Sequence, residues 1–68
     1  MPFVNIQILK GHPQARKDEI SRRVTEAISE VAQVPKQAVW VVFDDVAAED
    51  WYVGATSVSE MKKQAAKK

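Results

Sequence analysis

The spacing of apolar residues changes twice along this chain, from the period of a strand to that of a helix and back again. Over residues 3–9 apolar and polar positions alternate, with β-branched side chains on one face, which predicts a strand. Over residues 14–33 apolar residues recur at steps of three and four, which predicts an amphipathic helix. Residues 38–45 are rich in valine and aromatics and predict a second strand. The fold class is therefore α/β, a single β-α-β unit.

The length of the predicted helix determines how the two strands pair. A helix of about 20 residues is long enough to carry the chain back along the sheet, so we expect parallel strands joined by a right-handed crossover. Pro35 closes the helical region. Beyond the second strand we expect a loop at residues 46–50, a short hairpin at 51–54 and a weak helix or frayed tail at 57–68.

The predicted helix has one apolar stripe and one charged face. The stripe consists of Ile20, Val24, Ala27, Ile28 and Val31. On the other face Asp18 stands four residues before Arg22, and Glu19 four before Arg23, which is the favourable order for helical ion pairs. We therefore expect that face to be solvated.

A chain of 68 residues without cysteine has few ways to stabilise itself. A domain of this size buries only about 60% of the surface that its unfolded chain exposes, and disulfides are excluded. Two parallel strands and one helix also leave one sheet face and the strand edges uncovered, whereas parallel sheets are normally buried on both faces. We therefore expect a closed, symmetric homo-oligomer.

Composition excludes several classes of protein. No stretch approaches the roughly 20 apolar residues of a membrane span, and no secretory signal is evident, so we expect a soluble cytoplasmic protein without membrane contact. Residues 1–61 hold six Lys/Arg against nine Asp/Glu, whereas residues 62–68 hold four lysines. Without interleaved aromatics these lysines predict a solubilising tail at about 62–68 of a single domain, 1–68, and no nucleic-acid partner. His12 is the only histidine, so no metal site is expected.

Several motifs together resemble the 4-oxalocrotonate tautomerase family of the tautomerase superfamily. They are the Met-Pro start, the strand PFVNIQILKG, the helix ARKDEISRRVTEAISEV, Pro35, the valine-rich second strand and the segment WYVGA. The resemblance implies a tautomerase (MIF-like) fold that assembles as a homohexamer, a trimer of dimers, with active sites shared between neighbouring subunits. It also implies an N-terminal proline that acts as the catalytic base once the methionine is removed.

Pro2 occupies that catalytic position here, provided that Met1 is removed. A free α-amino group titrates at about 7.7–8.0 in model peptides, and burial beside apolar groups disfavours its cation. A base with a pKa near the working pH suits proton transfer next to a carbonyl. The proline ring also fixes φ, so the amine would be held rigidly at the mouth of the strand.

The substrate-binding positions depart from the family's pattern. Where the family's dicarboxylate-binding members have two arginines, this chain has His12 and Trp40, and neither forms a bidentate pair with a carboxylate. Trp51 stands at the place of the family's aromatic wall beside the proline. We predict these three as substrate-binding residues, with Lys10 or Arg16 as alternative cations.

The resulting functional prediction is a cofactor-independent tautomerase acting on a small 2-oxo acid or its enol, best a monoacid with an apolar or aromatic tail. One alternative is a hydratase, dehalogenase or decarboxylase of the same superfamily in which Pro2 is the acid. Such relatives carry a carboxylate just past the aromatic, where this chain has Val53, with Glu49 and Asp50 nearby. The other alternative is a non-enzymatic oligomer.

Overall fold

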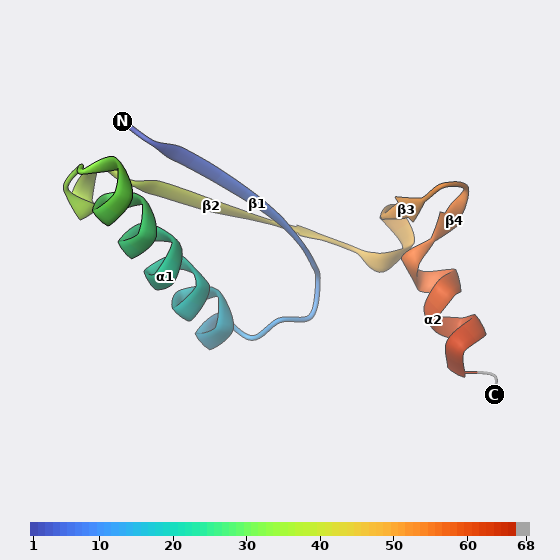
Figure 1. The fold of residues 1–68 in the computed structure, drawn as a ribbon. Coiled ribbons are helices and arrows are strands. Elements are labelled where there is room, and N and C mark those ends of the chain that lie inside the picture. Colours follow the sequence, from blue (N-terminus) through green and yellow to red (C-terminus); the bar gives the residue numbers. More distant parts are fainter. Residues whose placement is uncertain (67–68) are drawn as a thin grey trace.

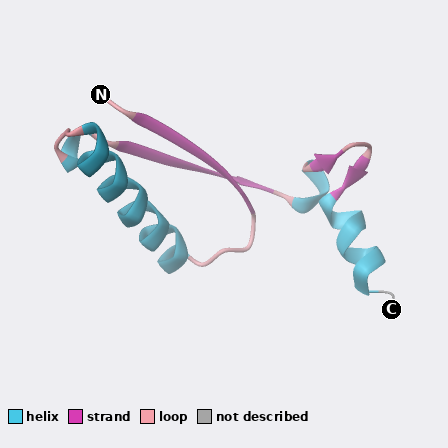
Figure 2. Ribbon diagram, in the orientation of Figure 1, coloured by secondary structure: helices cyan, strands magenta, loops and turns pink. Residues whose placement is uncertain are grey.

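The computed structural model describes residues 1–66 and shows the predicted β-α-β unit followed by a short hairpin and a second helix (Figures 1 and 2). The elements in order are β1 (Phe3–Leu9), α1 (Gln14–Ala32), the 3-10 turn η1 (Lys36–Ala38), β2 (Trp40–Val46), the 3-10 turn η2 (Ala48–Asp50), β3 (Tyr52–Val53), β4 (Thr56–Ser57) and α2 (Val58–Ala66). β1 and β2 are parallel and β3 and β4 antiparallel, as predicted.

The register of β1 and β2 separates the side chains of the sheet into two faces. Phe3 is aligned with Trp40 and Leu9 with Val46, so aligned residues share a face. The face beneath α1 is half-buried and mostly apolar; its members are Val4, Ile6, Ile8, Val41 and Phe43. Lys17 of α1 donates a hydrogen bond to Asp45 of β2 at 2.6 Å and ties the helix to this face. Within residues 1–66, no element covers the opposite face (Figure 1).

Helix α1 ends without a glycine. Gln33 takes the left-handed conformation, with φ 57° and ψ 50°, and its N–H donates to the Ser29 carbonyl. The N–H of Val34 donates to the same carbonyl at 3.2 Å, and the Ser29 hydroxyl donates to the Val34 carbonyl at 2.6 Å. These bonds satisfy carbonyls that the helix end would otherwise leave free, and Pro35 then prevents further helix.

Two predicted boundaries shift in the structure. The second strand begins at Trp40 and not at residue 38, because the N–H of Ala38 donates to the Pro35 carbonyl at 3.0 Å and closes a 3-10 turn. The hairpin spans residues 52–57 and not 51–54, with its turn at Gly54, whose φ is 65°. A glycine at positive φ is well suited to such a tight turn.

The predicted apolar stripe of α1 is only partly correct. Ile20, Val24 and Ile28 are half-buried, but Ala27 is exposed and Val31 is 84% exposed. Ile20, Val24 and Ile28 are spaced four residues apart, so they form one row along the helix. Ala27 and Val31 lie to one side of this row.

Helix α2 is better defined than the weak helix or frayed tail that was predicted. The Ser57 hydroxyl accepts a hydrogen bond from the Glu60 N–H at 3.1 Å, which caps the first turn. The helix continues through residues 62–66 of the predicted basic tail. Lys67 and Lys68 lie outside the described residues.

The single chain is elongated and lacks a closed core. Its radius of gyration is 15.8 Å, against about 11 Å for a compact domain of this length. No side chain in the described part of the chain is fully buried. Residues 47–66, here called the C-terminal arm, continue from the end of β2 and project away from α1 (Figure 1).

Within residues 1–66, no helix has the length and apolar character needed to cross a membrane.

Candidate active site

Pro2 lies immediately before β1 and is fixed by the neighbouring strand. Its carbonyl accepts a hydrogen bond from the Trp40 N–H at 3.0 Å, so the parallel ladder extends to the residue before the strand proper. Pro2 is half-buried, whereas Met1 is 86% exposed. The backbone at Pro2 is therefore held in place although it lies close to the chain terminus.

Trp40 brings a large aromatic surface to the same end of the sheet. It is the first residue of β2, lies opposite Phe3, and is 54% exposed on the face turned away from α1. Phe3 is 61% exposed and Val42 39% exposed on that same face. Pro2 is thus next to an open apolar surface, and of the four predicted site residues only Pro2 and Trp40 come together within one chain.

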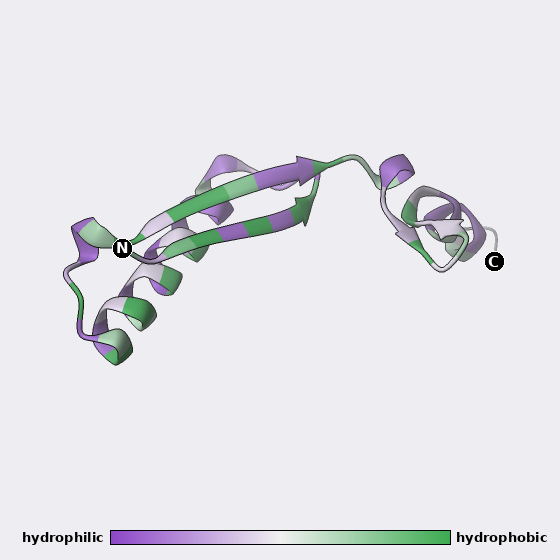
Figure 3. Ribbon diagram, turned by 90° about the horizontal axis from the view of Figure 1, so that it is seen from above, coloured by the Kyte–Doolittle hydropathy of each residue, from purple (hydrophilic) through white to green (hydrophobic). Residues whose placement is uncertain are grey.

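Figure 3 shows how hydropathy is distributed along the two strands. β2 changes from hydrophobic at its start to hydrophilic at its end, whereas β1 alternates along its length. At the hydrophilic end the amide Nδ2 of Asn5 donates to Oδ2 of Asp44 at 3.0 Å, on the uncovered face. The uncovered face is therefore apolar near Pro2, polar at Asn5, Gln7 and Asp44, and apolar again at Leu9 and Val46.

His12 lies at the opposite end of β1 from Pro2. The seven residues of β1 separate them, and a strand rises about 3.3 Å per residue, so they are roughly 20 Å or more apart. Nη1 of Arg16 lies 3.3 Å from Nδ1 of His12. His12 and Arg16 are four residues apart, and this spacing could have indicated their contact. The sequence instead suggested Arg16 only as an alternative cation.

Trp51 belongs to the C-terminal arm. It follows η2, its N–H donates to the Ala48 carbonyl at 3.4 Å, and its carbonyl accepts from the Val58 N–H at 2.7 Å. The side chain is half-buried. Because β2 separates Trp51 from Trp40, the chain by itself does not bring Trp51 to Pro2. No cavity is present within the part of one chain that the structure describes.

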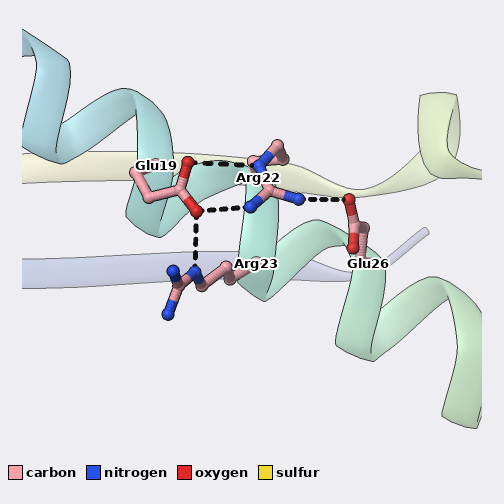
Figure 4. Close-up of polar contacts among 4 residues, drawn as sticks. All are labelled: Glu19, Arg22, Arg23 and Glu26. Atoms are coloured by element: carbon pink, nitrogen blue, oxygen red, sulfur yellow. Dashed lines mark hydrogen bonds and ion pairs between the residues drawn. The ribbon is translucent and has the colours of Figure 1, made fainter.

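The outer face of α1 carries a network of four charged residues (Figure 4). Glu19 accepts hydrogen bonds from Arg22 and, at 2.7 Å, from Arg23, while Arg22 also donates to Glu26 at 2.8 Å. The bonds from Arg22 and then Arg23 lower the pKa of Glu19 to about 2, and Glu19 followed by Glu26 raises the pKa of Arg22. The predicted Glu19–Arg23 pair is confirmed.

The other predicted pair, Asp18 with Arg22, is wrong. Arg22 is engaged by Glu19 and Glu26, and Asp18 instead accepts a hydrogen bond from the Gln14 amide at 3.2 Å. Arg22 and Arg23 are therefore both engaged in ion pairs within α1.

Among residues 1–66, no group of three or more histidine, cysteine or acidic side chains is arranged to hold a metal ion.

Nearly the whole chain is similar to known proteins. A family model described as "Tautomerase enzyme" matches residues 2–61. The "Probable tautomerase" of Streptococcus thermophilus strain CNRZ 1066 is 39% identical over 64 residues, which are 94% of this chain and 98% of that protein. The "Probable tautomerase" of Streptococcus mutans has the same identity and coverage.

Solved structures agree with these matches. One from work on the 4-oxalocrotonate tautomerase isozymes of Methylibium petroleiphilum is 32% identical, with a TM-score of 0.85 over 88% of this chain and 97% of the other. Another, from work on a heterohexamer 4-oxalocrotonate tautomerase of Chloroflexus aurantiacus, is 28% identical, with a TM-score of 0.85 over 90% and 98%. The chain therefore belongs to the 4-oxalocrotonate tautomerase family of the tautomerase superfamily and is an enzyme of the tautomerase type.

Proposed function

We propose that this enzyme is a cofactor-independent keto-enol tautomerase of a small 2-oxo acid, with the amine of Pro2 as its general base. The observation that supports this role most directly is the hydrogen bond from Trp40 to the Pro2 carbonyl, at 3.0 Å. It holds Pro2 rigidly while the residue before it is 86% exposed. Removal of Met1 would therefore cost little packing and would leave a secondary amine in a fixed position.

In this proposal the amine accepts a proton from the enol oxygen of the substrate and returns it to carbon. The ketonised product then leaves, and Pro2 is ready for another turnover. A positioned general base contributes about 10²–10⁴ in rate. Apolar surface from Trp40 and Trp51 would exclude water and disfavour the cationic form of the amine.

We further propose that the active site is completed by neighbouring subunits in a homohexamer, a trimer of dimers. Pro2 and His12 are at opposite ends of β1, and Trp51 is on the C-terminal arm, so one chain cannot place them around one small substrate. The uncovered sheet face, with its exposed Phe3 and Trp40, also needs a partner. Assembly would meet both needs.

The substrate that fits best is a monoacid with an apolar or aromatic tail, such as an enolpyruvate. Trp40 offers an aromatic surface where the family's dicarboxylate enzymes have a cation, and an indole N–H cannot form a bidentate pair with a carboxylate. The hydratase, dehalogenase or decarboxylase alternative stays a prediction, and Val53 supplies no carboxylate for it.

The test follows the ketonisation of phenylenolpyruvate by ultraviolet absorbance. We expect Pro2→Ala to lower kcat/KM by about 10² or more, because alanine leaves a primary amine that is free to rotate. Addition of one residue before Pro2 should remove activity further, since it converts the amine into an amide without basicity. Pro35→Ala is the matched control and should retain activity.

Intact mass must accompany the kinetics, because it shows whether Met1 has been removed. Equal rates for the wild-type enzyme and Pro2→Ala would reject Pro2 as the base. Full activity of a protein whose mass shows that it retains Met1 would reject it equally.

A further inference from the structure

Arg16 differs from the other two arginines of the chain. Arg22 and Arg23 are both engaged by carboxylates on the outer face of α1 (Figure 4). Within the described residues 1–66, no carboxylate lies in ion-pair contact with Arg16, although its side chain is charged and exposed. The guanidinium group therefore has donors available for another anion.

His12 contacts the side chain of Arg16 at the start of α1. A guanidinium group has only donors, so the contact of 3.3 Å requires Arg16 Nη1 to donate and His12 Nδ1 to accept. By accepting this hydrogen bond, His12 would orient the guanidinium group of Arg16.

The backbone beneath this pair is well defined. The N–H of Arg16 donates to the Pro13 carbonyl at 3.0 Å, which starts α1, and Gly11 turns the chain with a φ of 121°. His12 is half-buried, whereas Arg16 is exposed. One bond to His12 uses one of the five donors of the guanidinium group, and the rest can form the two parallel bonds that a carboxylate accepts.

We propose that Arg16 binds the carboxylate of the substrate and that His12 is its positioning residue. The inference rests on the proposed function, since the carboxylate belongs to the 2-oxo acid, and the neighbouring subunit would supply Pro2. One arginine oriented by one histidine binds one carboxylate group, so this assignment agrees with the proposed monoacid substrate.

The first experiment measures binding without turnover. Because the chain has three arginines, its side-chain 15N–1H spectrum should show three Nε signals, which Arg→Lys variants can assign. We expect cinnamate, an unreactive aromatic carboxylate, to shift the Arg16 signal saturably and to leave those of Arg22 and Arg23 in place. Cinnamamide, which has no charge, should produce no such shift.

The second experiment measures how substitutions of Arg16 change KM and kcat separately, with phenylenolpyruvate as the substrate. We expect Arg16→Gln to raise KM at least tenfold with little change in kcat, because hydrogen bonds to a charged group are worth about 1.5–3 kcal/mol, and Arg16→Lys to recover part of the loss. Arg23→Gln, with the same change of charge on the same helix, should keep the wild-type KM.

Variants of His12 test its positioning role. His12→Phe removes the acceptor and should raise KM and weaken the cinnamate-induced shift of Arg16, whereas His12→Asn retains an acceptor and should recover both. A purely structural role would lower stability without moving the Arg16 signal.

The outcomes separate this inference from the proposed function. Absence of a saturable Arg16 shift, equal shifts of all three arginines, or an unchanged KM in Arg16→Gln would overturn the assignment of Arg16 even if the enzyme ketonises phenylenolpyruvate. A saturable Arg16 shift without any ketonisation would support the carboxylate site and reject the proposed reaction.

Discussion

Glu19 shows how strongly single contacts can set the chemistry of a side chain on this small protein. Hydrogen bonds from Arg22 and then Arg23 lower its pKa from 4.5 to about 2. The folded protein therefore holds this proton less tightly than the unfolded chain does. The stabilisation from Glu19 is present above the unfolded value and is lost as the pH falls from about 4.5 through about 2.

We predict that Arg22→Gln raises the pKa of Glu19 toward 4.5, because it removes the largest of the stabilising contacts. The 13C chemical shift of the Glu19 carboxyl, followed against pH, measures this. Lys36→Gln is the control of equal charge change and should leave the value near 2. An unchanged titration in Arg22→Gln would show that Arg22 does not hold Glu19 in this way.

The site residues illustrate what a sequence can and cannot reveal at this scale. Pro2 could be singled out as the proposed base because that role depends on its place in the chain. The partner of His12 was missed because helical spacing permits several pairings, and only the rotamers show that Arg16 turns toward Nδ1. The incorrect pairing of Asp18 with Arg22 has the same origin.

The elements were predicted best where periodicity alone decides them. β1 has the predicted bounds, since its alternation is regular and Lys10 and Gly11 end it. β2 starts two residues later than predicted, because the Pro35 carbonyl closes a 3-10 turn with Ala38 that apolar composition does not reveal. The C-cap of α1 is Gln33, and a glycine, the usual sequence signal for a helix end, is absent at this position.

The left-handed Gln33 gives a prediction about the stability of α1. A non-glycine residue in this conformation destabilises the folded protein by about 1–2 kcal/mol. Glycine removes this strain, but it loses more chain entropy on folding, which costs about 0.5–1 kcal/mol. We therefore expect Gln33→Gly to stabilise the protein by about 0.5–1 kcal/mol. Thermal unfolding at one fixed protein concentration measures the change.

Two further variants serve as controls for Gln33. Gln33→Ala keeps the strain and should leave the unfolding temperature almost unchanged, whereas the β-branched Gln33→Val should lower it. A lower unfolding temperature for Gln33→Gly would mean that the Gln33 side chain makes contacts in the assembly that outweigh the backbone strain.

The whole molecule is the scale at which the sequence was least informative. Period and length predicted that a sheet face would be left uncovered, and the structure agrees, with a radius of gyration of 15.8 Å and no fully buried side chain in its described part. The projection of the C-terminal arm could not be foreseen, because no local pattern shows where a hairpin lies relative to a sheet.

Val42, on the uncovered face, allows the proposed assembly to be tested. Its side chain is 39% exposed in the single chain, so Val42→Lys should leave the subunit fold intact. In an assembly that covers this face, an unpaired charge would cost several kcal/mol. We expect a lower mass by light scattering, an unchanged circular dichroism spectrum and loss of activity, whereas the near-isosteric Val42→Thr should remain assembled and active. A hexameric, active Val42→Lys would exclude this face from the interface.

The length of β1 has a consequence for inheritance as well as for catalysis. Pro2 stands at one end of this strand and the His12–Arg16 pair beyond the other, roughly 20 Å or more away. On the proposed assembly each copy of the chain then lends its base to one site and its carboxylate-binding pair to another. A cell that makes one copy defective in Pro2 and another defective in Arg16 would form mixed hexamers, and some of their sites would combine the intact Pro2 of one copy with the intact Arg16 of the other. Two alleles that are each inactive alone would therefore complement each other in part.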